Sequence, residues 1–189
     1  MTEIDANIVS VFENVLTHHE LDVCTNLLSR PAWSFGHYSQ SSPVATPFWN
    51  MSLDGDTFFT NELFSRIQLL TGKKYTLLRV YANGQTFGQD GTYHLDDIRE
   101  QTYTFCLFMN KQITEDTVDN IGGEFIFKIP TSSTKTVDTH VNKITRVVVE
   151  PFYNRGVLFK ADIFHKGLAF NRYNKGLRIS IAWKLQLII

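Results

Sequence analysis

The sequence predicts a mainly β fold with flanking helices. From Tyr75 onward, β-branched and aromatic residues recur with a period of two, and Gly, Asn and Pro divide the runs into short strands. Before Tyr75, apolar residues instead recur at the spacing of a helix. Aromatic residues make up 13% of the chain and include 15 Phe, which also favours β structure. We therefore expect a closed or double-sheet β architecture with helices packed on its outside.

Two amphipathic helices are predicted ahead of the strands. Thr17 and Glu20 have the spacing of a capping box, and the helix that follows should end before Pro31. Its buried face is formed by Leu21, Cys24, Leu27 and Leu28. A second helix is expected over residues 57–71, with Gly72 as its C-terminal cap. Its apolar side comprises Phe58, Leu63, Ile67 and Leu70.

Seven strands are expected after the second helix, at residues 75–81, 102–109, 124–129, 144–149, 157–159, 163–170 and 177–189. Residues 31–54, between the two helices, are rich in Ser and Pro and are a candidate substrate lid or peptide wall, although ordinary packing explains their aromatic residues equally well. The chain shows no linker or internal repeat. We therefore expect residues 1–189 to form a single domain, with residues 1–74 as a helical preface that includes the lid and residues 75–189 as the β core.

The composition argues against several classes of partner. The 18 basic and 19 acidic residues give a formal net charge of −1, so no broad positive field attracts a phosphate backbone, which argues against nucleic acid. No basic and apolar leader and no run of membrane-spanning length is present, so we expect a cytoplasmic protein without a membrane partner. Cys24 and Cys106 lie in apolar runs without zinc-site spacing and are expected to be buried free thiols. The composition indicates no particular oligomeric state.

The sharpest local motif is His94-Leu95-Asp96. Side chains two residues apart on a strand point to the same face, so His94 and Asp96 can reach one metal ion together. Taken alone, such a pair is more often a surface histidine beside a solvated carboxylate. The motif therefore needs a third ligand from elsewhere in the chain.

His165 is the candidate for that third ligand, because it interrupts an otherwise apolar strand. It is either a core histidine or the last member of a two-histidine, one-carboxylate triad, which leaves three coordination positions of an oxygenase iron open. Zinc hydrolysis can use similar ligands, but the sequence shows neither a general base nor an oxyanion stabiliser. We therefore predict His94, Asp96 and His165 as the metal ligands and catalytic residues of an iron site.

Arg178 and Ser180 share one face of the last predicted strand. A guanidinium offers two parallel donors to a carboxylate and the hydroxyl adds another, so this face can bind one end of a small diacid. The alternative is an exposed arginine paired with an acid. The neighbouring Leu177, Ile179 and Ile181 argue against it, because they indicate a strand that is buried on both faces.

Five segments follow one another in an order typical of a known family. They are Tyr81-Ala82-Asn83-Gly84-Gln85-Thr86-Phe87, His94-Leu95-Asp96, Gly122-Gly123-Glu124-Phe125, Gly156-Val157-Leu158-Phe159 ahead of His165, and Arg178-Ile179-Ser180. In this order, residues 75–183 resemble the 2-oxoglutarate/iron(II) dioxygenases of the prolyl 4-hydroxylase type.

The resemblance implies that family's fold, a double-stranded β-helix, which is a jelly-roll or cupin-like barrel, preceded by an N-terminal helical segment. It implies an enzyme that binds Fe(II) through His94, Asp96 and His165. The cosubstrates would be 2-oxoglutarate and O2, with ascorbate as a candidate reductant, and the reaction would hydroxylate a substrate C–H bond while forming succinate and CO2. Arg178 and Ser180 would bind the distal carboxylate of 2-oxoglutarate.

Two departures from the family's pattern concern the cosubstrate pocket. Phe108 stands where some relatives carry a second tyrosine, so the missing hydroxyl is expected from Tyr81, Tyr103 or Thr104. We take Tyr81 and Thr104 as cosubstrate-binding candidates. Trp183 is an odd number of residues from the arginine and is expected to face away from it, whereas the family's tryptophan shares its face.

The substrate class stays open at this level. The resemblance favours a prolyl 4-hydroxylase-like hydroxylase of a peptide or protein. The alternatives are a hydroxylase of a free amino acid or other small molecule, and a non-catalytic cupin-like module that binds a metal or ligand. Arg172, Asn174 and Arg178 have the spacing found in alkyl-base repair dioxygenases, but Arg172 lies in a predicted turn and the chain lacks a basic surface, which argues against base repair.

Overall fold

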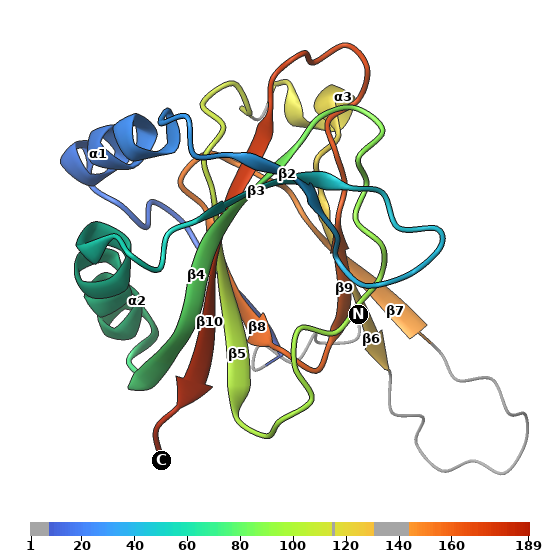
Figure 1. The fold of residues 1–189 in the computed structure, drawn as a ribbon. Coiled ribbons are helices and arrows are strands. Elements are labelled where there is room, and N and C mark those ends of the chain that lie inside the picture. The colour runs from blue at the N-terminus through green and yellow to red at the C-terminus, as the bar shows by residue number, and fades with distance from the viewer. Residues whose placement is uncertain (1–7, 115, 131–143) are drawn as a thin grey trace, which may run out of the picture.

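The computed structural model describes residues 8–114, 116–130 and 144–189, and its strands far outnumber its helices (Figure 1). In chain order the elements are β1 (Val9–Phe12), α1 (His18–Leu28), β2 (Ser34–His37), β3 (Phe48–Ser52), the π-helical turn η1 (Phe58–Glu62), α2 (Leu63–Thr71), β4 (Tyr75–Gln85), β5 (Thr102–Phe108), α3 (Val118–Ile121), β6 (Phe125–Pro130), β7 (Ile144–Val149), β8 (Gly156–Lys160), β9 (Phe164–Gly167) and β10 (Arg178–Leu187).

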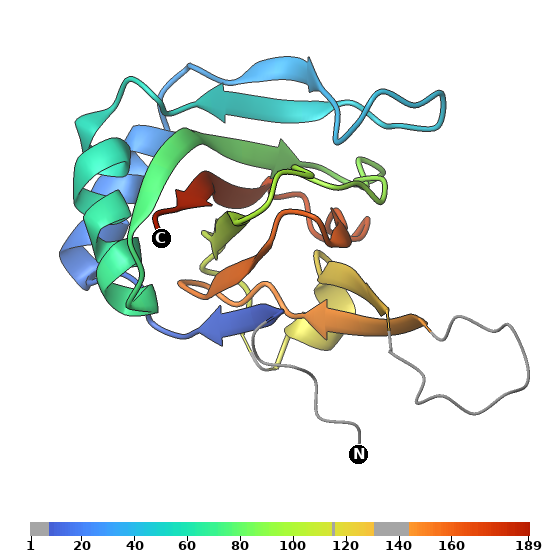
Figure 2. The ribbon, with the colours of Figure 1, turned by 90° about the horizontal axis from the view of Figure 1, so that it is seen from below.

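The strands form two antiparallel sheets. The main sheet has seven strands in the order β1-β8-β5-β10-β4-β3-β2, and the smaller sheet has three in the order β7-β6-β9. Helices α1 and α2 lie together on the side of the main sheet that is remote from the smaller sheet (Figures 1 and 2). This arrangement confirms the predicted mainly β fold with helices on its outside.

Side-chain alternation along the strands divides most of the core into two large clusters. On β10, Ile181, Trp183 and Leu185 belong to the outer cluster with the helices, whereas Ala182 belongs to the inner cluster with residues of both sheets. The indole of Trp183 is fully buried and donates to the carbonyl of Phe59 at 2.9 Å. Trp183 therefore faces away from Arg178, as predicted, and packs toward the helices, which leaves the inner face of β10 for shorter and polar side chains.

Both predicted helices are present. In α1, the amide of Glu20 donates to the Thr17 hydroxyl at 3.3 Å and the Glu20 carboxylate accepts from the Thr17 amide at 2.7 Å, which is the predicted capping box. The second helix begins as the π-helical turn η1 and ends at Gly72, whose φ is 65°. Leu70, in the last turn, is 37% exposed, so the apolar side predicted there is one turn too long. Within the described ranges, no helix is both long and apolar enough to cross a membrane.

The first 74 residues also contribute three strands that the sequence reading missed. β1 pairs with β8, and β2 and β3 form a hairpin that extends the main sheet beyond β4. Residues 31–54, the candidate lid, therefore include a β-hairpin that the sequence did not predict. β2 is an edge strand whose residues are mostly exposed on both faces, so it carries no apolar alternation from which a strand could be predicted.

The two cysteines are free and buried, as predicted. Cys24 lies on the buried face of α1 in the outer cluster, and Cys106 packs in the inner cluster between the sheets. Burial raises the pKa of each thiol to about 12, so neither is a thiolate at neutral pH.

Candidate metal centre and its cavity

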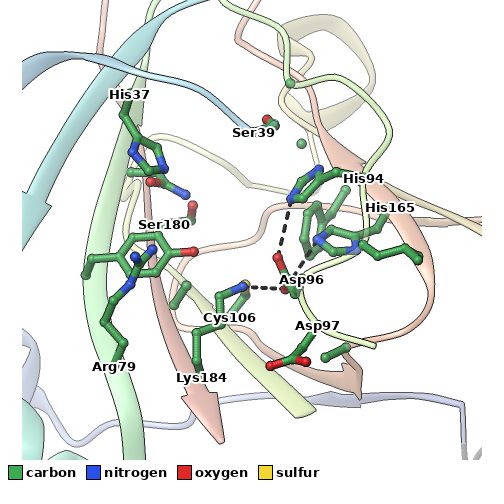
Figure 3. A pocket seen from close by; sticks show the side chains of 18 of the residues that line it. His37, Ser39, Arg79, His94, Asp96, Asp97, Cys106, His165, Ser180 and Lys184 are labelled. Carbon is green, nitrogen blue, oxygen red and sulfur yellow. Dashed lines mark ion pairs between the residues drawn. The ribbon is translucent and has the colours of Figure 1, made fainter. Parts of the chain in front are cut away.

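Three side chains that can bind a metal converge between the two sheets. The ligand atoms of His94, Asp96 and His165 all lie within 4.8 Å of one another. Nε2 of His94 lies 3.4 Å from Oδ1 of Asp96, and Nε2 of His165 lies 3.5 Å from Oδ2 of the same carboxylate (Figure 3). The structure thus brings together the three residues that the sequence predicted as ligands.

Backbone hydrogen bonds hold His94 against β9 and Asp96 against the turn that precedes β9. His94 and His165 exchange two backbone hydrogen bonds of 3.1 Å as an isolated bridge, and the amide of Asp96 donates to the carbonyl of Ala161 at 2.9 Å. The segment is a loop with one bridge, so the prediction that His94 and Asp96 lie on a strand is wrong. Anchoring at alternate residues nevertheless turns both side chains to the same side, which is why the motif converges.

Both imidazoles present the same nitrogen to the centre. Nδ1 of His94 lies 2.9 Å from the carbonyl of Thr92, and Nδ1 of His165 lies 2.8 Å from the carbonyl of Ile163. A carbonyl can only accept, so Nδ1 carries the proton in each ring and Nε2 keeps its lone pair. Burial, partly offset by Asp96, lowers the pKa of His165 to about 4, so this ring is neutral at physiological pH, as a metal ligand must be.

Asp96 is held by two further side chains. The Thr104 hydroxyl donates to Oδ2 at 2.6 Å, and Nζ of Lys184 forms an ion pair with the same oxygen (Figure 3). Burial alone would raise the pKa of Asp96, but Lys184 and then the histidines hold it well below its usual range. Burial also opposes the charge on Lys184, yet Tyr81 and Asp96 together raise the pKa of the ammonium above its usual value. Asp96 is therefore ionised, and its Oδ1 is the oxygen that neither Thr104 nor Lys184 uses.

The three side chains open into a cavity of about 360 Å³ between the sheets. This volume is within the range of about 300–1,000 Å³ that is typical of small-molecule sites. Tyr81, Arg178 and Ser180, which the sequence predicted as cosubstrate residues, line the cavity as well. Thr104 does not, because it is fully buried behind Asp96, where its hydroxyl orients that carboxylate.

Arg178 is a buried cation held by neutral oxygen atoms. It is 2% exposed, and it donates from Nε to the carbonyl of Gly123 at 2.7 Å and from Nη1 to Oε1 of Gln85 at 2.9 Å. Nη2 is buried and has no hydrogen-bond partner among the described residues. Burial lowers the pKa of Arg178 to about 10, so it stays protonated at neutral pH. A charged group with an unused donor facing a cavity is suited to an anionic ligand.

Two glycines leave room around the Arg178 side chain and its neighbour Phe170. A Cβ on Gly167 would lie 3.3 Å from both Nη1 and Nη2 of Arg178. Gly123 has a φ of +94°, and a Cβ there would lie 2.7 Å from the ring of Phe170. Gly167 follows His165 by two residues on β9, which is about 7 Å along a strand. A five-carbon diacid can bridge such a span between the guanidinium and the metal centre.

The other predicted pocket residues lie on the inner face of the main sheet, Ser180 beside Arg178 and Tyr81 farther along the cavity. The Ser180 hydroxyl lies 3.5 Å from Nη1 of Arg178, at the outer limit of a hydrogen bond. Tyr81 lies opposite Ala182 on the neighbouring strand. The Phe108 ring centroid lies 5.5 Å from the guanidinium carbon, so a cation–π contact occupies the position of the family's second tyrosine.

Sequence reasoning missed Lys184 and Gln85. Lys184 is six residues after Arg178 on the same strand face, and it is a charged residue inside an apolar strand, the signal that identified His165. Gln85 gave no such signal, because it meets Arg178 only through the pairing of β4 with β10. Arg172, considered above for base repair, stacks on Tyr173 and lies outside the cavity lining.

No protein-family model matches the sequence, and no curated protein is significantly similar to it. The structure is similar to a prolyl hydroxylase from Trichoplax adhaerens in complex with a peptide fragment of the hypoxia inducible factor oxygen degradation domain. The TM-score is 0.65 at 16% identity, over 96% of this chain and 84% of the other. It is also similar to a 2OG-Fe(II) oxygenase family oxidoreductase from Burkholderia pseudomallei, with a TM-score of 0.66 at 13% identity, over 96% and 86% of the chains.

A third similar structure catalyses a different reaction. It is a non-heme alpha ketoglutarate dependent epimerase from nogalamycin biosynthesis, with a TM-score of 0.64 at 13% identity, over 95% of this chain and 79% of the other. The same epimerase is also known in complex with Fe3+ and alpha ketoglutarate. These similarities show that the chain has the double-stranded β-helix fold of 2-oxoglutarate oxygenases, as the resemblance in sequence implied.

Proposed function

We propose that the protein is an Fe(II)- and 2-oxoglutarate-dependent oxygenase that hydroxylates a C–H bond of its substrate. The observation that carries this proposal is the joint presence, in one cavity, of the His94, Asp96 and His165 ligand atoms and the buried, partly unpaired guanidinium of Arg178. A site that only binds a metal needs the three ligand residues, and a site that only binds a diacid needs Arg178. Their combination is what a metal-bound diacid cosubstrate requires.

The three ligands fit Fe(II). Two neutral imidazole nitrogens and one carboxylate oxygen form the donor set of non-heme iron oxygenases, and they leave positions open for other ligands. The hydrogen bonds from Nδ1 to backbone carbonyls fix both rings, and Thr104 and Lys184 fix the carboxylate. In the residues that the structure describes, no further His, Cys, Asp or Glu joins this cluster to close the site.

The cavity also fits 2-oxoglutarate. Nη2 of Arg178 is a charged donor without a partner among the described residues, and the distal carboxylate would complete its hydrogen bonding. Gly167 leaves the space beside the guanidinium free of a side chain, since a Cβ there would lie 3.3 Å from Nη1 and Nη2. In the epimerase with a similar fold, alpha ketoglutarate and iron bind together, which supports the same pair here.

The residues of this chain bind and orient the reactants, whereas the redox chemistry belongs to the metal. When bound, Fe(II) with 2-oxoglutarate and O2 would supply an oxidant strong enough to hydroxylate an unactivated C–H bond, with succinate and CO2 as coproducts. The protein would contribute by holding the substrate C–H bond beside the open metal positions. Burial of His165 and Asp96 keeps bulk water from these two ligands. No catalytic base is required.

We further propose a prolyl residue of a peptide or protein as the substrate, in line with the prolyl hydroxylase that binds a peptide fragment and shares this fold. A free amino acid or other small molecule is the alternative substrate. The similar epimerase supports this alternative, because it shows that the fold accommodates reactions other than prolyl hydroxylation.

Two measurements test the proposed function. Iron titration should show one equivalent per chain, and Asp96→Ala or His165→Ala should abolish it, whereas Asp97→Ala, which changes a carboxylate paired with Arg99, should not. Iron-loaded wild type should then convert 2-oxoglutarate to succinate, faster with a prolyl peptide, and mass spectrometry should find one added oxygen on that peptide. Oxygen on a free amino acid would support the alternative substrate. No succinate under any of these conditions would leave a non-catalytic binding module as the better account.

A further inference from the structure

Two cations lie side by side on adjacent strands in the middle of the main sheet. In the pairing of β10 with β4, Lys184 lies opposite Arg79, on the face that lines the cavity. Directly opposed residues have Cβ atoms about 5 Å apart, and like charges in such a pair are destabilising. The register shifts immediately beyond this pair, so that Leu185 lies opposite Leu77 and Leu78 forms a bulge. Such irregularities are over-represented beside functional sites, where they direct a side chain.

Only one of the two cations has an anionic partner within the described part of the chain. Lys184 forms an ion pair with Asp96. No carboxylate of the described residues lies within ion-pair distance of Arg79, although Arg99, on the same cavity, is paired with Asp97. Arg79 is therefore a solvent-exposed cation at the cavity that pairs with no carboxylate of the described residues and does not hold a metal ligand.

Arg79 is held in place by an aromatic ring. Its guanidinium carbon lies 4.2 Å from the centroid of Tyr81, and Nζ of Lys184 lies 5.7 Å from the same ring. The ring centroid of His37 lies 6.0 Å from that of Tyr81, so the group is supported from β2 as well. Figure 3 shows Arg79 and His37 on the wall of the cavity opposite His94 and His165. The guanidinium is thus oriented in advance, which reduces the entropy lost when a ligand binds.

We propose that the substrate carries a carboxylate and that Arg79 binds it, while the C–H bond to be oxidised lies toward the metal centre. This inference rests on the proposed function, because it assigns the other end of the substrate to that centre. A planar fork of donors matches a carboxylate, and an anion at this point would offset the opposed charges of Arg79 and Lys184. The carboxylate can come from an acidic residue beside the target in a peptide, or from the α-carboxylate of a free amino acid.

Calorimetric titration with matched probes tests the proposal without turnover. The probes are two capped peptides with a central proline flanked by glutamate or by glutamine, and free L-proline with L-prolinamide. Each is titrated into protein loaded with Mn(II) and 2-oxoglutarate, and into metal-free protein. The acidic member of one pair should bind about fivefold more tightly than its neutral partner, the upper range for a partly solvated ion pair. The pair that shows the preference identifies the source of the carboxylate.

Three variants separate the role of Arg79 from a general effect of charge. Arg79→Gln should remove the preference, and Arg79→Lys should retain part of it because the charge remains without the fork. Arg146→Gln, an equal change of charge at an exposed position of β7 outside the cavity lining, should leave it intact. Equal or undetectable affinity for both members of both pairs in the wild type, or a preference that survives Arg79→Gln, overturns the proposal. A preference that Arg79→Gln removes in a protein that forms no succinate would support the carboxylate site and refute the oxygenase.

Discussion

Replacing Arg178 by Met should separate cosubstrate binding from folding. The substitution keeps an unbranched, flexible side chain of about the length of the arginine stem and removes the guanidinium, whose Nη2 is buried without a hydrogen-bond partner among the described residues at the edge of the cavity. It also leaves the Gly123 carbonyl and the Gln85 amide oxygen without their donor, at a cost of about 1–3 kcal/mol for each acceptor that stays dry. Against this, a buried cation without a carboxylate partner among the described residues is removed, which is favourable by a similar amount. The unliganded variant should therefore unfold within a few degrees of the wild type.

The effect on 2-oxoglutarate binding should be much larger. Loss of one partner of a buried charge pair typically costs about 2–5 kcal/mol, which raises the dissociation constant by roughly 30- to 5,000-fold. At a ligand concentration of 100 times the wild-type Kd, binding stabilises the native state by about 2.7 kcal/mol. For a chain of this size that is a rise in Tm of about 5–11 °C. In Arg178→Met, the same concentration of 2-oxoglutarate should raise the Tm by no more than about 3 °C.

Thermal unfolding with Mn(II) in place of iron provides the assay, because it reports binding without turnover. Arg172→Met is the matched control, since it removes an equal charge from a turn outside the cavity lining and should keep the full shift. An equal rise in Tm in wild type and Arg178→Met would refute the reasoning, because another residue would then bind the distal carboxylate.

Three further outcomes follow from named contacts. Thr104→Val removes the hydroxyl that donates to the proposed ligand Asp96, and it should weaken iron binding about 10- to 100-fold in a metal titration. Thr102→Val is the control, because it loses a hydrogen bond to a backbone carbonyl instead. Gly123→Ala should lower the free energy of unfolding in urea by at least about 2 kcal/mol more than Gly88→Ala. Both glycines have positive φ, but only the Cβ added at Gly123 would meet a ring, that of Phe170. Equal losses in the two variants would contradict this. Burial tends to raise the pKa of Glu20, but its cap hydrogen bonds and ion pair lower it overall, so its stabilisation is present above the unfolded pKa and lost as the pH falls through the folded one. Glu20→Ala should therefore cost about 1 kcal/mol at pH 7 and progressively less as the pH falls below the usual pKa of a glutamate, and a difference independent of pH would count against the cap.

The parts of the fold that the sequence predicted are those set by local periodicity. The alternation of Arg178 and Ser180 with Ile179 and Trp183 follows from strand geometry alone, so both faces of β10 could be assigned before any partner was known. The same rule failed for His94 and Asp96 in detail, because the chain there is a loop that β9 and a turn hold at alternate residues. The rule still predicted correctly that both side chains point to the same side, because the chain is anchored at alternate residues.

The parts that the sequence did not predict depend on contacts between distant segments. Gln85 supports Arg178, and Arg79 opposes Lys184, only because β4 and β10 pair in one register, which no local pattern encodes. The role of Thr104 was misplaced for the same reason, because its neighbour Asp96 comes from a separate loop. The strand β2 was missed because an exposed edge strand needs no apolar alternation.

The position of β10 has a consequence for how the chain folds. β10 lies between β4 and β5 in the main sheet although it follows both by about 70 residues or more, and β4 and β5 do not pair with each other. Until β10 inserts, each of these strands has an open edge and the two halves of the sheet are not joined. Pairings of such sequence separation are slow to form, on the order of milliseconds to seconds, and expose apolar strands in the meantime. The strand that carries Arg178 and Lys184 is thus also the one whose insertion joins the two halves of the main sheet.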